Sequence, residues 1–200
     1  MVRCLLFATA FVTAGITNAF AESLPESLLH CDSRFFSALY SSASQLKDTA
    51  PLIKQKPYAW FAQPRSGNDV LWFSQPLRVG KLTLEGYFRR DSIYGADERF
   101  YFWGFILSES PQEVIASLHD VEWKADGDGY MARGMIMRAG DSEWQENRSA
   151  VSGIATAKGS TERVVMLENR QGKTQLLCTV QGSVTDKQIL PLRPDLAGEK

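Results

Sequence analysis

The stretch Leu82–Leu107, LTLEGYFRRDSIYGADERFYFWGFIL, decides the fold of this chain. In its first half, Leu82, Leu84 and Phe88 alternate with polar residues, which is the period-two pattern of a strand with one buried face. Its second half, Phe100–Leu107, is apolar on both faces of an extended chain and has to be covered on both sides. The stretch therefore predicts the central hairpin of an antiparallel sheet.

Aromatic residues concentrate around this hairpin. Between Tyr58 and Phe105 lie 13 of them, which makes this part of the chain its richest source of buried apolar area. The cluster predicts the core of the domain, with Trp103 as a fully buried member. An alternative stays open, in which Tyr87, Tyr101 and Trp103 line a ligand pocket.

The first residues, 1–21, have the features of a secretory signal peptide. Arg3 precedes an apolar run over 5–16, and Ala19-Phe20-Ala21 supplies the small residues that a signal peptidase requires. The run is too short to be a membrane anchor, because a transmembrane helix needs roughly 20 residues. Cleavage before Glu22 predicts a periplasmic or secreted protein with no membrane span in its mature form.

Composition and charge favour one domain that does not bind nucleic acid. The chain has 200 residues, of which 44% are hydrophobic, and no Pro-rich or Gly/Ser-rich linker divides it. Its 22 basic and 23 acidic residues are interleaved, whereas a nucleic-acid surface requires a basic stripe. We expect a single domain over 22–184. An extended or disordered tail should follow over 185–200, where Pro191, Pro194 and Gly198 occur.

Two cysteines of the mature chain, Cys31 and Cys178, are predicted to form a disulfide. Cys31 lies on the apolar stripe of a long helix predicted over Pro25–Leu46. Cys178 shares one face of a strand with Leu176 and Val180. Both sulfur atoms should point inward, and export would deliver the chain to an oxidising compartment. The bridge would join the first helix to the last strand; two buried free thiols are the alternative.

The remaining sequence indicates further antiparallel strands and one short helix. Ser110-Pro111-Gln112-Glu113 is a helix-start signal, with an N-cap hydroxyl, a proline at the first helical position and a glutamate reaching back. Asp126-Gly127-Asp128-Gly129 predicts a hairpin turn. Tyr58–Ala62 and Val70–Ser74 are expected to pair as another hairpin. The predicted fold class is α+β, a twisted antiparallel sheet of about seven to nine strands with the long N-terminal helix and the short helix packed on it.

No motif for catalysis, a metal or a cofactor stands out in the sequence. It contains neither a Gly-x-Ser-x-Gly turn nor a phosphate-binding glycine loop. His30 and His119 are too few for a zinc site, so no metal or cofactor is expected. Acid–base chemistry stays open because paired carboxylates leave little sequence signature. The candidates around the central hairpin loop are Glu85, Asp91, Asp97 and Glu98.

The expected function is non-enzymatic binding of another protein, as by an inhibitor or an immunity-type partner. The predicted binding residues are Arg89, Arg90 and Tyr94 at the end of the central hairpin, because arginine and tyrosine are enriched at interface hot spots. Pairing of the two arginines with Asp91 or Glu98 is the alternative explanation for their presence. A small-molecule or lipid-binding protein that uses the curved sheet is the second function considered, and a carboxylate-based hydrolase is the third.

Overall fold

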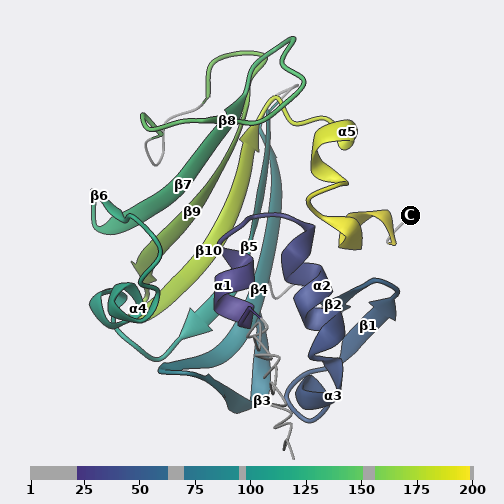
Figure 1. Cartoon of the computed structure of the whole chain (residues 1–200), viewed down its shortest axis with the longest axis vertical. Helices are drawn as coiled ribbons and strands as arrows, with labels where there is room; N and C mark the ends of the chain where they lie inside the picture. The colour runs from purple at the N-terminus through teal and green to yellow at the C-terminus, as the bar shows by residue number, and fades with distance from the viewer. Residues whose placement is uncertain (1–21, 63–69, 95–97, 151–155, 199–200) are drawn as a thin grey trace, which may run out of the picture.

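An antiparallel sheet dominates the structure, a computed structural model that describes residues 22–62, 70–94, 98–150 and 156–198 (Figure 1). Within these residues, one eight-stranded sheet has the order β3–β4–β5–β10–β9–β7–β6, with β8 paired to β7. The antiparallel sheet of an α+β protein is thereby confirmed, and the predicted signal peptide lies outside the described residues. The strands are β3 Val70–Val79, β4 Leu82–Tyr94, β5 Glu98–Leu107, β6 Lys124–Asp126, β7 Gly129–Met137, β8 Gln145–Glu146, β9 Thr161–Arg170 and β10 Lys173–Gly182.

Strand β5 lies inside the sheet, between β4 and β10. Trp103 is the register partner of Arg89 on β4 and of Cys178 on β10. The side chains of Trp103, Phe105 and Leu107 are all 0% exposed. The predictions of a central β4–β5 hairpin and of Trp103 as a core residue are therefore confirmed.

The expected hairpin between Tyr58–Ala62 and Val70–Ser74 is wrong. Strand β2, Tyr58–Phe61, pairs instead with β1, Leu52–Gln55, in a separate two-stranded sheet, and β3 pairs with β4. Closing the short turn between β1 and β2 costs less chain entropy than closing the longer loop before β3. The same pairing leaves β3 available as a neighbour for β4.

The long helix predicted over Pro25–Leu46 is instead three short ones. The first of the two breaks lies at Cys31, whose φ of 51° falls in the left-handed region and cannot continue a right-handed helix. Asp32 then acts as a new N-cap, because its side chain accepts a hydrogen bond from the N–H of Arg34. The three helices are α1 Leu24–Leu28, α2 Ser33–Ser41 and α3 Ala43–Leu46.

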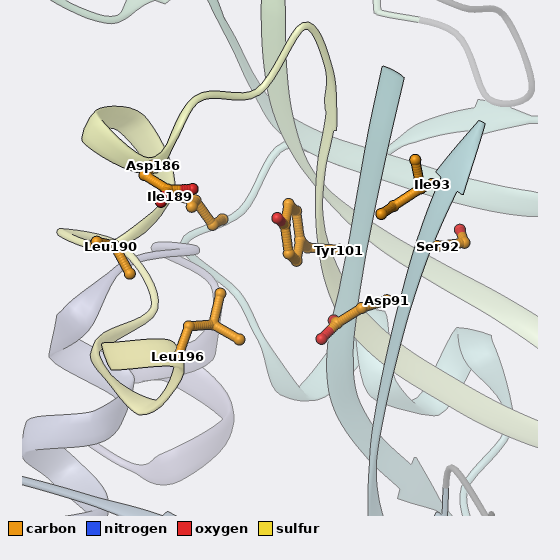
Figure 2. A pocket seen from close by; sticks show the side chains of 8 residues that line it. All are labelled: Asp91, Ser92, Ile93, Tyr101, Asp186, Ile189, Leu190 and Leu196. Carbon is orange, nitrogen blue, oxygen red and sulfur yellow. The ribbon is translucent and has the colours of Figure 1, made fainter. Parts of the chain in front are cut away.

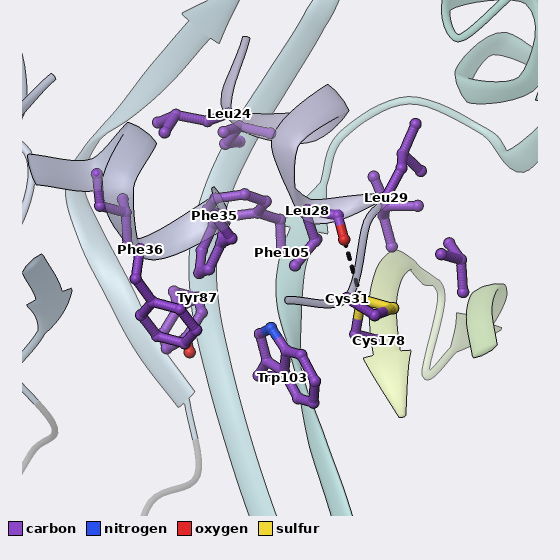
Figure 3. Packing of buried hydrophobic residues seen from close by; sticks show 14 of the residues in the cluster. Leu24, Leu28, Leu29, Cys31, Phe35, Phe36, Tyr87, Trp103, Phe105 and Cys178 are labelled. Atoms are coloured by element: carbon purple, nitrogen blue, oxygen red, sulfur yellow. Dashed lines mark hydrogen bonds between the residues drawn. A yellow bond between two sulfur atoms is a disulfide. The ribbon is translucent and has the colours of Figure 1, made fainter. Parts of the chain in front are cut away.

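The predicted disulfide between Cys31 and Cys178 is confirmed. The two Cα atoms lie 5.3 Å apart, and 147 positions separate the residues in sequence. Because the helix is broken at Cys31, the bond joins the α1–α2 connection, rather than a helix, to β10 (Figure 3). Both cysteines are buried beside Leu28 and Trp103 in the main apolar cluster.

The helices cover one face of the sheet. The buried apolar side chains of α1, α2, α4 (Pro111–Ser117) and α5 (Asp186–Ile189) belong to the same cluster as Trp103. Helix α4 begins with the capping box predicted at Ser110. The opposite face of the sheet has a smaller cluster of Phe88, Ile106 and Leu177. Among the described helices, none has the length and apolar composition needed to cross a membrane.

Over the described residues 185–198 the C-terminal segment is folded, which differs from the extended or disordered tail expected over 185–200. After α5, a 3-10 turn over Pro194–Ala197 places Arg193 in the core, where it is fully buried. Two hydrogen bonds, of 2.8 and 2.7 Å, join its guanidinium to the Asp195 carboxylate, and the guanidinium stacks 4.8 Å from the Trp103 ring. A buried charge requires partners of this kind. The proline, glycine and charged residues of the segment did not indicate that Arg193 would find them.

The disulfide should contribute strongly to stability. Replacing both Cys31 and Cys178 with Ser removes the restraint on a loop of 147 residues, for which the chain-entropy model gives about 5 kcal/mol as an upper figure. We expect a loss of about 2 to 5 kcal/mol in the free energy of unfolding, measured by urea denaturation of the two proteins. Equal stability of wild type and variant under oxidising conditions would contradict this expectation.

The Arg193–Asp195 pair should be needed to hold the C-terminal segment on the sheet. Arg193→Met leaves the Asp195 carboxylate buried without its bidentate partner, so the free energy of unfolding should fall by about 3 to 5 kcal/mol. Lys187→Met, at an exposed position of α5, is the matched control and should change stability by less than about 0.5 kcal/mol. Similar urea midpoints for the two variants would show that the buried pair is dispensable.

Candidate functional site

A cleft of about 700 Å³ opens beside β7, between that strand, the α1–α2 connection and the segment after β8. Its size lies within the usual range for small-molecule sites, and its lining combines an apolar floor with charged side chains. The lining residues are Leu29, His30, Arg34, Asp120, Val121, Glu122, Lys124, Met131, Ala132, Arg133, Gly134, Met135, Glu146, Asn147, Arg148, Ala150, Arg163 and Val164. We call it the arginine-lined cleft.

An interruption in the sheet creates this cleft. The pairing of β7 with β9 shifts register between Ala132 and Met135, so the two intervening residues bulge out of the ladder. Within the bulge, Arg133 has a φ of 51°. At Gly134, a Cβ atom would lie 2.5 Å from the Asn147 carbonyl oxygen, so the approach of that segment requires glycine. The bulge thus redirects Arg133 and seats Asn147 against the sheet.

His30 connects two arginines of the cleft. Arg133 donates a hydrogen bond of 3.1 Å from Nη1 to Nδ1 of His30, and Arg163 donates one of 3.4 Å to the His30 carbonyl oxygen. The other ring nitrogen of His30 lies 2.7 Å from the Glu22 carboxylate. Arg163 also stacks on Trp144, at 4.9 Å from the ring to the guanidinium carbon. Two guanidinium groups, from β7 and β9, thus contact the same residue, one at its ring and the other at its carbonyl oxygen.

Neither Arg133 nor Arg163 forms an ion pair with a carboxylate of the described residues. The neighbouring cations do: Arg34 pairs with Asp32 at 2.8 Å, and Arg148 pairs with Glu146 at 2.9 Å. Burial lowers the pKa of Arg163, with the charge of Asp32 opposing that shift. Its buried Nε has no hydrogen-bond partner in the described part of the chain. The pair Arg133 and Arg163 is therefore suited to receive a negatively charged group from outside the chain.

A buried carboxyl group supports the wall of the cleft that Asn147 forms. Asn147 and Gln181 both donate side-chain hydrogen bonds to Glu162, the latter at 3.0 Å. Glu162 is only 4% exposed, and this burial raises its pKa although the two amides favour the charged form. The position of Asn147 therefore depends on a titratable group behind it.

The residues predicted for binding do not converge. Arg89 faces the helices, where its guanidinium lies 3.4 Å from Asp195 and 3.7 Å from Asp91. Arg90, on the opposite face, has its guanidinium 6.0 Å from the rings of both Phe88 and Phe102. The alternative explanation given for the arginines, pairing with a neighbouring acid, thus describes Arg89. A binding role for Arg90 stays a prediction.

Tyr94, the third predicted residue, is 72% exposed at the hairpin end, and its ring meets Phe100 edge-on. Close to it, a hollow of about 340 Å³ separates the hairpin from the C-terminal segment (Figure 2). The hollow is largely apolar, with Tyr101 at its centre in the view of Figure 2. Its two carboxylates already have partners, since Asp91 lies near Arg89 and Asp186 lies 3.4 Å from Arg99. It therefore offers fewer groups for recognition than the arginine-lined cleft.

Of the carboxylates considered for acid–base chemistry, Glu85 and Asp91 each lie beside a cationic side chain. Glu85 accepts hydrogen bonds from Lys173 and Ser108, which lower its pKa. Asp91 faces Arg89 and Arg193, and Asp97 lies outside the described residues. Within the described ranges, no group of three or more His, Cys, Asp or Glu side chains has the arrangement of a metal site.

Sequence reasoning missed Arg133 and Arg163. A signal for Arg163 was present in the sequence. Alternate side chains of a strand share one face, so Arg163 lies on the same face of β9 as Val165 and Leu167, which face the helices. An arginine at this position interrupts a buried apolar stripe. Arg133 had no comparable signal, because the bulge that redirects it depends on contacts with Asn147.

Comparison with known proteins assigns the chain to no family, since no family model, curated protein or solved structure matches it.

The raised pKa of Glu162 should appear as a pH dependence of stability. The native state keeps this proton to a higher pH than the unfolded state, so raising the pH from 4 to 7 should stabilise the unfolded state relative to the native one. In Glu162→Gln this dependence should disappear, and the free energy of unfolding of wild type minus that of the variant should decrease over the same interval. Urea denaturation at several pH values measures this difference in the free energy of unfolding. Glu143→Gln, at an exposed position, is the control. A difference that stays constant or grows with pH would contradict the assignment.

Proposed function

We propose that the mature protein is an exported, non-enzymatic binding protein that holds a small molecule with an acidic group in the arginine-lined cleft. The observation that carries the proposal is the pair Arg133 and Arg163, which lines a cleft of about 700 Å³ and forms no ion pair with a described carboxylate. Arg163 is partly buried and feels the charge of Asp32 without a direct ion pair, so a bound anion would offset the free energy that its burial still costs.

Export is supported by two independent features. The disulfide between Cys31 and Cys178 is typical of proteins that fold in an oxidising compartment. The first 21 residues have the composition of a signal peptide. A periplasmic or secreted location would give the cleft access to small molecules outside the cytoplasm.

Binding of another protein is the second candidate. Ile93 and Tyr94 are 73% and 72% exposed at the end of the central hairpin, and large apolar side chains in such positions favour contact with a partner. The two candidates use different surfaces, so one set of variants separates them.

The test of the cleft compares ligands that differ only in charge. Hexanoate should bind the mature protein, and hexanamide should bind at least tenfold more weakly, measured by isothermal titration calorimetry. Arg133→Ala removes a charge-assisted hydrogen bond worth about 1.5 to 3 kcal/mol, so the affinity for hexanoate should fall by roughly ten- to a hundredfold. Arg138→Ala is the matched control, because Arg138 is exposed just after β7 and does not line the cleft.

Mass spectrometry of the protein purified from its native envelope decides between the candidates. A small acid that is retained by wild type and lost in Arg133→Ala supports the cleft. A protein that is retained by wild type and lost in the double variant Arg90→Ala, Tyr94→Ala supports the hairpin. Equal binding of hexanoate and hexanamide would contradict the proposed recognition of an acid.

A further inference from the structure

The arginine-lined cleft contains carboxylates as well as guanidinium groups. Asp120 and Glu122 line it together with Arg133 and Arg163. Neither carboxylate forms an ion pair with a cation of the described residues, and Lys124, which also lines the cleft, pairs with neither of them. Within the described part of the chain, the cleft therefore has groups of both signs that lack an ionic partner.

The acidic and the basic groups are carried by different elements of the fold. Arg133 and Arg163 come from β7 and β9, and both contact His30 in the α1–α2 connection. Asp120 and Glu122 belong to the segment between α4 and β6. One cleft thus receives its positive charges from the sheet and its negative charges from a connecting segment.

The electrostatic surroundings of two arginines show where Glu122 lies within the cleft. Burial lowers the pKa of Arg163, and Asp32 is the acidic group that opposes this shift. The pKa of Arg148 is raised first by its hydrogen bond to Glu146 and by the charge of Glu146, and the charge of Glu122 adds to the shift. The carboxylate of Glu122 therefore lies closer to Arg148 than to Arg163.

Much of the remaining lining of the cleft is apolar. Leu29 and Val121 contribute to it, and Met131, Ala150 and Val164 form a buried cluster there. Such a surface favours a ligand with an apolar body. A molecule that fills the cleft therefore meets apolar side chains and charges of both signs.

We infer that the ligand of the cleft is a zwitterion, with an acidic group on Arg133 and Arg163, an apolar body, and an amino group on Asp120 and Glu122. This inference rests on the proposed function and specifies its ligand class. A simple acid would leave the two carboxylates unpaired and be repelled by them, whereas a simple amine would be repelled by the two arginines. A ligand that carries both charges satisfies both sets of side chains.

The first test compares ω-amino acids with unsubstituted acids of the same length by isothermal titration calorimetry. The probes are 4-aminobutanoate, 6-aminohexanoate and 8-aminooctanoate, against butanoate, hexanoate and octanoate. The tightest amino acid should bind roughly fivefold more tightly than its matched acid, a modest gain because Asp120 and Glu122 are exposed. Hexylamine, which lacks the acidic group, should bind more weakly than 6-aminohexanoate.

The second test removes the two negative charges of the cleft. The double variant Asp120→Asn, Glu122→Gln should lower the affinity for the tightest amino acid roughly fivefold. The same variant should not weaken hexanoate, since it removes like charges from the neighbourhood of that anion. Glu143→Gln, at an exposed position outside the cleft, is the matched control and should alter neither affinity. Arg133→Ala should weaken the amino acid and hexanoate alike.

The outcomes separate this inference from the proposed function. If each amino acid binds no more tightly than its matched acid, the zwitterion is overturned and the acid-binding cleft still stands. If the advantage of the amino acid persists in the double variant, its amino group does not bind Asp120 and Glu122, and the inference is wrong. If neither the acids nor the amino acids bind, the proposed function itself fails.

Discussion

The burial of the second half of β5, Trp103–Leu107, on both faces is the constraint on which the rest of the structure depends. A strand with large apolar side chains on both faces cannot lie at an edge or face water. On one side, α1, α2 and the C-terminal segment enclose Trp103, with the Cys31–Cys178 bond beside it and the Arg193 guanidinium stacked on its ring. On the other side, Ile106 joins Phe88 and Leu177 in a thinner apolar layer that the helices do not cover. The two faces of this strand are therefore buried in separate apolar clusters, a large one under the helices and a small one on the opposite face.

The arginine-lined cleft is a local departure from the regular sheet. A continuous β7–β9 ladder would leave no opening at Val164, and Arg133 would take its regular place in the strand. The bulge produces both the opening and the meeting of Arg133 with His30. Bulges are common near functional sites for this reason, since they redirect a side chain without changing the fold. Arg163 is held in the same place by Trp144 and by a backbone carbonyl, neither of which neutralises its charge.

Much of the fold was predictable from local patterns. Alternation along β4, the turn at Asp126-Gly127 and the capping box at Ser110 each depend on residues close in sequence, and each matches the structure. The candidate site was less predictable. Arg89 and Arg90 are neighbours in sequence, but the pleat of a strand turns adjacent side chains to opposite faces, so the two could not serve one site on the sheet. The same rule, applied to β9, would have marked Arg163 as an arginine on a buried stripe.

By itself, the sequence determined the antiparallel sheet, the burial of Trp103 and the pairing of Cys31 with Cys178, because periodicity and apolar content specify which faces are buried. Only the tertiary structure decided where the N-terminal helix breaks, how the C-terminal segment folds and where two arginines meet. The left-handed turn lies at Cys31, which is bonded to Cys178, and Arg193 is buried against the ring of Trp103, so both places have partners far away along the chain. The cleft depends on a register shift between β7 and β9, which is set by the packing of Asn147 on Gly134. Such contacts have no local pattern, since their energy comes from groups that meet only after the chain has folded.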